Sequence, residues 1–576
     1  MSLEETKARL LAASNTSEGL LAQIYDSYIQ ELESEEKLLA KALSELHNSG
    51  GIDLIKLVEG VDRNAFGDGF FTILLAFENT LPSLNANVED VLHCLVTLKR
   101  QADTGGLFGA FGRFCSMEPH RPRNSIDFIM TQNERDEYGL FLASSILAYD
   151  SEHVADAIQM TKNLRAIGNN TVRDQIYCTL GKLDVDDANA KVIWEILCNS
   201  ASVERDDGCR ATMLRSILYF GEGFPSYWSQ IEDLLIVFVE EASPEVLHAI
   251  SDILAFQRVE LPNNIFHLMI KQLSNVSSEH NRTISNIDYV LVKLVKTHSP
   301  SLAVELLEST LALGVSIADL GYFSRELLSK HRDLLNHITT RWFLSGETSL
   351  CHSVLELLQT VTSKDIELKA ELVLIDDDVR QVFASRKAVG WLFMRPIAAA
   401  SFILSIYEVA STTSRKNLEE ILYDPLLLSY PGELKRFLQL CVKQDVQEKL
   451  CGNLLEKLED YHADIEKISG MKELMAPSEN LSTYWKDANK EMESAYENAS
   501  KFSILRDIAT TQTLLYGNSS IYYLHQGDGT RVRQEMKMQS FSHSTEMPRL
   551  NVLDPESLDY TLRIFRYERM KDEVNS

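Results

Sequence analysis

Disulfide and metal-binding cysteine patterns are absent from this sequence. Its eight cysteines are scattered along the chain and include no C-x-x-C pair. Most of them lie within apolar patterns typical of helices, so we interpret them as buried free thiols in a reducing compartment. The N-terminus is charged from Glu4 onward and lacks the basic segment and apolar run of a signal peptide. Together these features predict a cytoplasmic protein.

Long hydrophobic runs are also missing. The nearest approach lies between Ala388 and Ala410, where only Arg395 and Glu408 are charged. The uncharged part is shorter than the roughly 20 residues that a membrane-spanning helix needs. The sequence therefore predicts no membrane span, and it favours a helix that begins at Pro396 and is buried on most sides.

Catalytic and cofactor motifs are absent as well. The sequence contains no H-x-x-x-H or H-E-x-x-H pair of histidines and no G-x-S-x-G nucleophile motif. The acidic residues at 184–187 faintly resemble a calcium loop, but Ala188 stands at a ligand position, which favours an ordinary acidic helix start. We therefore predict no cofactor, no metal and no catalytic residue, and we interpret the chain as more typical of a binding protein than of an enzyme.

Positive charge is scarce relative to negative charge. The chain has 56 basic and 84 acidic residues, a formal net charge of −28. A surface of this kind repels phosphate backbones and anionic membranes, whereas a neutral or basic protein partner is easier to accommodate. Binding to nucleic acid is thus disfavoured overall and would need a local cationic patch.

What the sequence does contain is a helical rhythm of apolar residues. Between residues 226 and 361 they recur at i, i+3, i+4 and i+7 in one segment after another, with short polar breaks between the segments. Helices this short are unstable alone in water, so each must bury its apolar stripe against a neighbour. Stacked antiparallel helix pairs achieve this most simply. The predicted fold class is therefore mostly all-α.

Helix starts support this interpretation. Ser243-Pro244 and Ser299-Pro300 place a hydroxyl before a proline at the first helical position. The helix predicted at 244–254, together with a spacing of roughly 30 to 55 residues between helix pairs, resembles armadillo/HEAT-type helical repeats over residues 136–440. This resemblance implies an α-solenoid. An irregular helical array or bundle would give a similar pattern.

The N-terminal region, residues 1–135, is predicted to be helical. The apolar pattern between residues 18 and 46 favours an intramolecular hairpin of helices over a partner-binding coiled coil. Its least regular stretch is 104–115, where glycines at 106, 109 and 112 match neither nucleotide-binding spacing. We interpret it as a loop or a close-packed helix corner. Exposed phenylalanines here, with Arg113, Arg121 and Arg123, would form a small recognition patch.

The C-terminal part departs from the pattern. Residues 441–510 are predicted as charged long helices, and 511–576 as a small β-hairpin plus a capping helix. Two β-like segments, 521–525 and 530–538, flank a Gly-Asp-Gly turn signal. Asp554-Pro555 then begins a last helix with Leu558, Leu562 and Phe565 on its apolar side.

Basic residues concentrate in this tail. From residue 527 to 571 there are eight basic and seven acidic residues, a net charge of +1 against an acidic remainder. The tail is therefore predicted to act as an intramolecular cap or to contact an anionic partner. The candidate contact residues are Arg531, Arg533, Arg563, Arg566 and Arg569.

Three functions follow from these observations. The first is a non-enzymatic scaffold that binds a protein partner in a helical-repeat groove. The second is an accessory subunit of a nucleic-acid-processing or defence complex, which would use the Arg113/Arg121/Arg123 or Arg563/Arg566/Arg569 clusters. The third is an enzyme with a site in the tail, where His525, His543, Arg531, Arg533 and Glu535 form a polar cluster. The oligomeric state is open.

Overall fold

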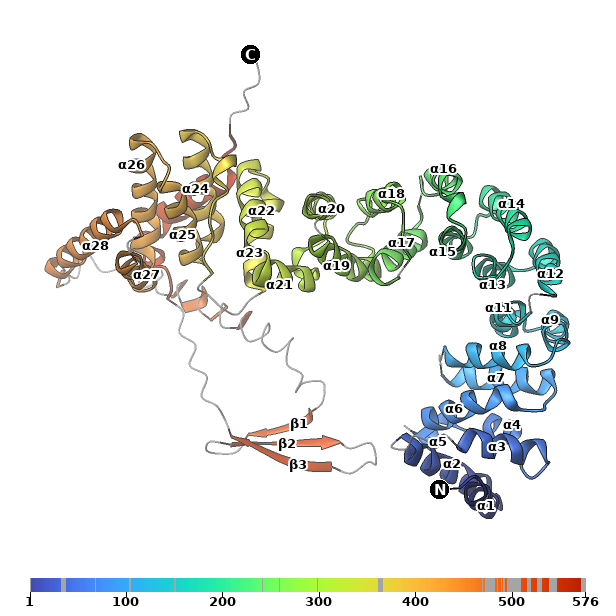
Figure 1. The fold of residues 1–576 in the computed structure, drawn as a ribbon. Helices are drawn as coiled ribbons and strands as arrows, with labels where there is room; N and C mark the ends of the chain where they lie inside the picture. The colour runs from blue at the N-terminus through green and yellow to red at the C-terminus, as the bar shows by residue number, and fades with distance from the viewer. Residues whose placement is uncertain are drawn as a thin grey trace. The chain divides into compact units, whose positions relative to one another are not determined.

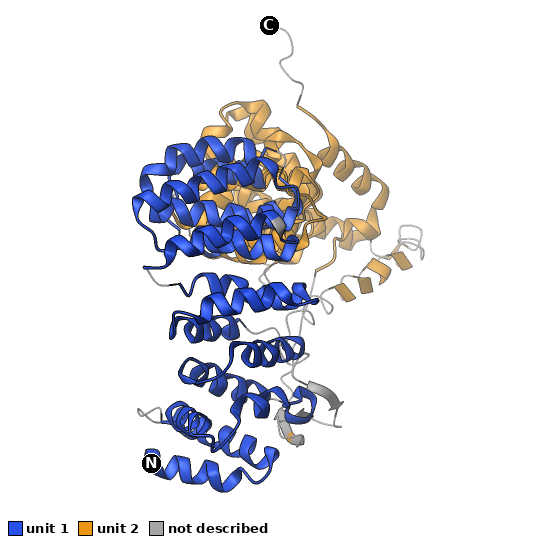
Figure 2. Cartoon of the chain, turned by 90° about the vertical axis from the view of Figure 1, so that its right-hand side faces the viewer, with its two compact units in different colours: residues 1–273 blue, residues 274–576 orange. Residues whose placement is uncertain are grey.

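The computed structural model is almost entirely helical in the part of the chain that it describes (Figure 1). The chain forms two compact units, Met1–Leu273 and Ser274–Ser576 (Figure 2), and the predicted boundaries at 135, 440 and 510 stay predictions. The described residues are 2–32, 38–67, 69–102, 105–149, 152–240, 242–257, 259–297, 299–360, 366–444, 446–468, 470–471, 482–483, 485–487, 489–490, 493–494, 509–514, 519–525, 531–537 and 546–570.

Unit 1 is a succession of mostly short helices. Its α-helices are α1 (Leu3–Ala13), α2 (Ser17–Leu32), α3 (Leu39–Asn48), α4 (Leu54–Glu59), α5 (Arg63–Phe66), α6 (Gly69–Thr80), α7 (Val88–Gln101), α8 (Gly106–Ser116), α9 (Arg121–Thr131), α10 (Arg135–Tyr138), α11 (Leu142–Ile146), α12 (Val154–Ile167), α13 (Asn170–Leu180), α14 (Asp187–Val203), α15 (Asp207–Gly223), α16 (Trp228–Phe238), α17 (Pro244–Phe256) and α18 (Asn263–Leu273).

The first part of unit 1 encloses a continuous apolar core that extends from Leu10 to Phe141. The predicted pair of helices between 18 and 46 is confirmed, since α2 and α3 are separate helices that both pack against α6. Of the two interpretations of 104–115, the loop is wrong from residue 106 onward, because α8 (Gly106–Ser116) occupies that part. Two of its phenylalanines, Phe111 and Phe114, are buried rather than exposed.

The second part of unit 1 is built from two rows of helices. In one row α11 packs on α13, α13 on α15 and α15 on α17, and in the other α12 packs on α14, α14 on α16 and α16 on α18. Each of the helices α11 to α16 therefore contacts the helix two places further along the chain. Figure 1 shows α13, α15 and α17 along one side of this part and α12, α14, α16 and α18 along the other.

Polar side chains cross-link these layers at a recurring sequence separation. In both units, hydrogen bonds join residues that lie 33 to 38 positions apart in the sequence. Examples are Asn48 with Asn85, Arg100 with Glu137, Asn170 with Asp206, Asp174 with Thr212, Glu308 with Arg341, Asn336 with Lys369, Asp378 with Ser411 and Glu419 with Lys457. These hydrogen bonds connect helices that neighbour each other in space but belong to successive helix pairs along the chain.

Unit 2 continues with helices and also contains strands. Its elements are α19 (Asn281–Lys296), α20 (Pro300–Ala312), α21 (Gly321–Lys330), α22 (Arg332–Ser345), α23 (Thr348–Gln359), α24 (Asp378–Leu392), α25 (Pro396–Tyr407), α26 (Thr412–Ile421), α27 (Pro431–Lys443), α28 (Glu448–Ile468), β1 (Ala509–Leu514), β2 (Ser519–His525), β3 (Arg531–Lys537), α31 (Leu550–Leu553) and α32 (Pro555–Tyr567).

The three strands of unit 2 form one antiparallel sheet in the order β1-β2-β3. Strands β2 and β3 pair from Ser519 opposite Lys537 to His525 opposite Arg531. They fall on the two segments that the sequence analysis assigned to strands, whereas β1 had not been expected. Residues 526–530, where the turn was predicted, lie outside the described residues, so the turn stays a prediction.

Several helix starts follow the sequence signals. Ser243 caps α17 by accepting a hydrogen bond from the backbone amide of Val246, and Asp554 accepts one from Ser557 at the start of α32. Pro300 begins α20 as predicted, but the cap expected from Ser299 is wrong, because its side chain makes no capping hydrogen bond. The predicted helix at Pro396 is confirmed as α25, which is buried along nearly its whole length.

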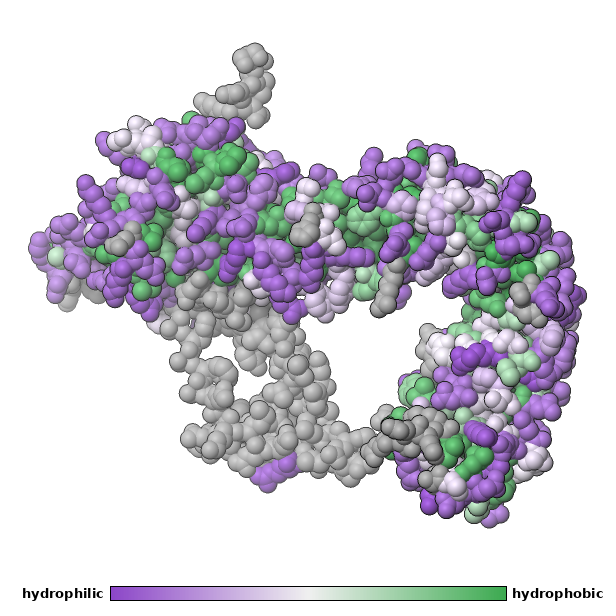
Figure 3. All heavy atoms as spheres, in the orientation of Figure 1, coloured by the Kyte–Doolittle hydropathy of each residue, from purple (hydrophilic) through white to green (hydrophobic). Residues whose placement is uncertain are grey.

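The helices bury their apolar sides, so their polar side chains face outward. On the face shown in Figure 3, hydrophilic residues cover most of the described part, and hydrophobic residues appear in smaller areas among them. Within the described residues, no helix combines the length and the apolar character that crossing a bilayer requires.

The contact between α13 and α15 generates the first testable prediction. A Cβ atom placed on Gly181, the residue that ends α13, would lie 2.2 Å from the backbone oxygen of Ser216 on α15. Gly181→Ala should therefore push the two helices apart and lower the free energy of unfolding by about 1–3 kcal/mol.

Urea denaturation followed by circular dichroism measures this effect as a shift of the transition midpoint. Gly223→Ala, at the end of α15, is the matched control because no atom lies within 4 Å of its added methyl group. Equal midpoints for both variants would contradict the close packing of α13 on α15.

Candidate functional site

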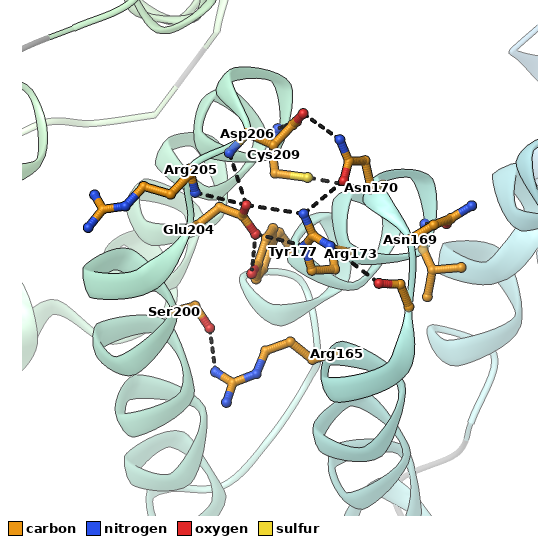
Figure 4. A network of polar contacts seen from close by, with 12 residues as sticks. Arg165, Asn169, Asn170, Arg173, Tyr177, Ser200, Glu204, Arg205, Asp206 and Cys209 are labelled. Atoms are coloured by element: carbon orange, nitrogen blue, oxygen red, sulfur yellow. Dashed lines mark hydrogen bonds and ion pairs between the residues drawn. The ribbon is translucent and has the colours of Figure 1, made fainter.

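A hollow in the described part of unit 1 lies where α12 and α13 meet the loop between α14 and α15. Its volume is about 650 Å³. Three structural elements contribute arginines to its lining: α12 contributes Arg165, α13 contributes Arg173, and the loop contributes Arg205. Glu204 and Asp206 of the same loop supply negative charge (Figure 4).

Helix ends bring these residues together. Asn169 caps α13 by accepting a hydrogen bond of 3.0 Å from the backbone amide of Val172. Asp206 caps α15 through the amide of Cys209 at 2.9 Å and also accepts a hydrogen bond of 2.6 Å from Asn170. The loop that carries Glu204 is therefore fixed both to the helix that follows it and to the preceding helix pair.

Glu204 is the centre of the polar network. Its carboxylate accepts hydrogen bonds from Arg173 Nε at 2.9 Å and from the Tyr177 hydroxyl at 2.9 Å. The backbone amides of Arg205 and Asp206 donate to it at 3.0 and 3.1 Å. With only 5% of its surface exposed, Glu204 depends on these donors to remain charged.

The ionisation of Glu204 follows from this arrangement. Burial by itself raises the pKa of the carboxyl group, but the hydrogen bonds from Arg173, Asp206 and Tyr177 outweigh burial and lower the pKa below its usual value. Glu204 is therefore a carboxylate at neutral pH. It holds the loop in place and does not exchange protons with a bound molecule.

The neighbouring hydroxyl and thiol groups are in their neutral forms. Burial and the Glu204 carboxylate raise the pKa of Tyr177, and burial raises the pKa of Cys209 to about 12. A thiol in this state is a weak nucleophile. The chemistry of the hollow is therefore recognition by charge and hydrogen bonding.

Two arginines that line the hollow keep unused hydrogen-bonding capacity within the described residues, and Figure 4 shows the Arg205 side chain extending away from the Glu204 network. Within the described residues, Arg165 donates only through Nη1, to the Ser200 hydroxyl at 2.6 Å and to the backbone oxygen of Ile196 at 3.3 Å. The side chain of Arg205 is exposed, and within the described residues its guanidinium makes no hydrogen bond. The two acidic residues of the hollow, Glu204 and Asp206, already accept several hydrogen bonds each from the chain itself. The positive charge that is left to bind another molecule is therefore that of Arg165 and Arg205.

The arginine patch predicted near 113–123 is not brought together as one surface. Arg121 is buried, and its guanidinium donates to the backbone oxygens of Phe114 at 3.0 Å and Leu84 at 3.2 Å. Arg123 is exposed and pairs with Asp127 on its own helix at 2.9 Å. Arg113 is exposed. Arg121 therefore joins helices within unit 1.

The arginines of the last helix differ in exposure. Arg563 is exposed and pairs with Asp559 at 2.8 Å. Arg566 is half-buried and donates through Nε to the backbone oxygen of Gly390 at 2.6 Å. Arg569 pairs with Glu347 at 2.7 Å. Two of the three thus bind the helical body, as an intramolecular cap would.

The predicted polar cluster of the tail can be placed only in part. His525 lies at the end of β2, and Arg531, Arg533 and Glu535 lie on β3, where the side chain of Arg533 is exposed. The side chains of the other three, and the whole of His543, lie outside the described residues. The catalytic hypothesis for the tail therefore stays a prediction.

The two weaker motifs also have structural explanations. Asp186 caps α14 by accepting a hydrogen bond of 2.9 Å from Asn189, which confirms the acidic segment as a helix start. Gly106 lies against Glu78, whose carboxylate occupies the place where a Cβ atom would project. The described residues include no group of three His, Cys, Asp or Glu side chains arranged to hold a metal ion.

Sequence reasoning missed the hollow. Arg173 and Glu204 are 31 positions apart, and Arg165 and Ser200 are 35 apart. Neither pair forms a local motif. A separation of this size predicts a contact only when it is known which helices pack together.

Comparison with protein-family models and with curated protein sequences finds no match for this chain.

The Glu204 network generates a stability prediction. Glu204→Gln removes the charge that Arg173 and Tyr177 contact and should lower the free energy of unfolding by about 2–4 kcal/mol at pH 7. Because the folded pKa of Glu204 is lowered, its contribution is present above the unfolded pKa and is lost as the pH falls through the folded pKa.

Chemical denaturation at pH 7 and at pH 3 measures this dependence. The stability difference between the wild-type chain and Glu204→Gln should shrink at the lower pH. Glu195→Gln, an exposed position on α14, is the control and should behave like the wild type at both pH values. A difference that does not change with pH would contradict the role of the Glu204 charge.

Proposed function

We propose that the chain is an α-solenoid of the armadillo/HEAT type that acts as a protein-interaction scaffold. Two observations support the solenoid: the packing of helices two places apart, and the polar contacts at separations of 33 to 38 residues. Stacked helix pairs form extended surfaces on which binding sites are built from successive repeats. Eight free cysteines favour a reducing compartment, in keeping with a cytoplasmic location.

The hollow of unit 1 is the proposed partner site. The observation that carries this proposal is the pair Arg165 and Arg205, which line an open hollow while Arg173 is held by Glu204. Guanidinium groups bind carboxylates through two parallel hydrogen bonds, and such charge-assisted bonds are stronger than neutral ones. The partner therefore presents an Asp or Glu side chain, or a C-terminal carboxylate, to these two arginines.

A protein partner is favoured over nucleic acid by the surrounding charge. The net charge of −28 repels a polyanion along its whole length, whereas a single carboxylate on an otherwise neutral or basic protein meets only the local field. Of the clusters considered for nucleic acid, Arg121 is buried, and Arg566 and Arg569 bind the chain itself. A role as an accessory subunit that binds nucleic acid is therefore the second candidate function, after the protein-interaction scaffold.

Replacement of both arginines tests the proposed site. The protein is purified from its own cells with whatever binds it stoichiometrically, and the affinity of that partner is measured by calorimetry. Arg165→Ala with Arg205→Ala should weaken binding about 10- to 100-fold, because each arginine contributes a charged contact near the centre of the site.

The matched control replaces two exposed arginines of unit 2, Arg380 and Arg436, by alanine, and it should leave the affinity unchanged. Equal affinities for the two double variants would overturn the site. Recovery of RNA or DNA in place of a protein, released at high salt, would support the second candidate.

A further inference from the structure

The last helix, α32, is held on the helical body by an unusual contact. Lys387 on α24 is fully buried, and its Nζ atom donates to the backbone oxygens of Arg566 at 2.7 Å and Glu568 at 2.6 Å. Both oxygens lie at the C-terminal end of α32. Within the described residues Lys387 makes no ion pair. Its ammonium group is bonded instead to the end of a helix, which carries partial negative charge.

The surface beneath α32 is shaped for the close approach of a helix. Gly390, one turn after Lys387, would place a Cβ atom 3.0 Å from the backbone nitrogen of Arg566 and 3.0 Å from Cβ of Phe565. In return, Arg566 Nε donates to the Gly390 oxygen at 2.6 Å. Lys387 and Gly390 thus define a slot on α24 that accepts the last turn of a helix.

The apolar anchoring of α32 in this slot is small. Of its thirteen residues only Leu558 and Leu562 are buried, and Phe565 is half-buried. These three stand at i, i+4 and i+7, which is one side of a helix. A helix that serves only to cap a repeat array has a polar outer face. The helix α32 does not fit that description, because Tyr560, Ile564 and Tyr567 are exposed on it.

Several polar atoms at this contact lack a partner. Within the described residues, the buried atoms Arg386 Nε, Trp391 Nε1 and Glu568 Oε1 make no hydrogen bond. Burial of such atoms opposes docking, and they regain hydration when the helix leaves. Contacts that are polar and small in apolar area allow relative motion of the parts that they join, whereas large apolar contacts do not.

From these observations we infer that the α24 slot is a helix-binding site, that α32 occupies it as a displaceable plug, and that an amphipathic helix of a protein partner binds there in its place. The contacts of α32 define the chemistry of that helix: apolar residues at i, i+4 and i+7, and free backbone oxygens in its last turn. This inference rests on unit 2 alone and does not depend on the hollow of unit 1.

A peptide with the sequence of residues 555–570, labelled at its N-terminus, tests the slot. It is titrated with the full-length chain, and binding is followed by fluorescence anisotropy. A full-length variant with Leu558→Asp and Leu562→Asp, whose own helix competes poorly, should bind the peptide about tenfold more tightly than the wild type or better, because a tethered plug has a high effective concentration.

Two further changes in that variant test the slot itself. Gly390→Ala should weaken peptide binding about tenfold although alanine favours the helical state of α24, and Lys387→Met should weaken it by a similar factor. The matched controls are Gly452→Ala, which has no atom within 4 Å of the added methyl group, and the exposed Lys369→Met. Binding that responds equally to test and control changes would overturn the inference.

Hydrogen exchange of the wild-type chain provides a second test that needs no variant. Amides of α32 should exchange through local opening while those of α24 remain protected. Exchange of both helices at one common rate would show that α32 leaves only on unfolding, which would overturn the displaceable plug. Dimers formed by exchange of α32 between two copies would overturn the assignment of the slot to a partner protein.

Discussion

The structure depends on one constraint: short helices, most of them 10 to 17 residues long, have to bury their apolar stripes against helices from neighbouring pairs. In unit 1, α13 packs on both α11 and α15, and α15 also packs on α17. A helix of this length is marginal alone in water. Stability therefore comes from contacts between layers, and Gly181 illustrates how close these contacts are, because its place on α13 leaves no room for a side chain against α15.

Polar side chains fix the register of the layers. Glu204 ties the α14–α15 loop to α13, and Asp174 on α13 accepts a hydrogen bond of 2.5 Å from Thr212 on α15. The hollow lies beside this pinned loop, where Arg165 joins α12 to α14 through Ser200 and Ile196 and Arg205 is exposed. The partner site that we propose is thus a by-product of the way in which adjacent helix pairs are joined.

Local signals in the sequence were sufficient to predict much of the helical fold. A hydroxyl or carboxyl group before proline placed the starts of α17 and α32, and the run after Pro396 placed the buried helix α25. The stretch 104–115 was misjudged because glycine has a low intrinsic helix propensity, while the buried Phe111 and Phe114 stabilise α8 through contacts distant in sequence.

The functional residues were not predictable in the same way. Arg121 belongs to an exposed-looking basic cluster in the sequence, yet it is buried and bonded to backbone oxygens of two segments. Lys387 follows Arg386 like a surface residue, but α32 covers it from a distance of some 180 positions. Contacts of this kind depend on how the layers pack, and no local pattern encodes them.

The central claim is that the hollow of unit 1 contacts a protein partner, and photo-crosslinking inside cells tests it most directly. Val203 lines the hollow and is largely exposed, so a photoreactive amino acid can replace it without disturbing the core. The account predicts a discrete crosslinked protein from position 203 and none from Glu195, which is exposed on the same helix outside the hollow. Identical crosslinking from both positions, or none from position 203 while the partner is bound, would contradict it.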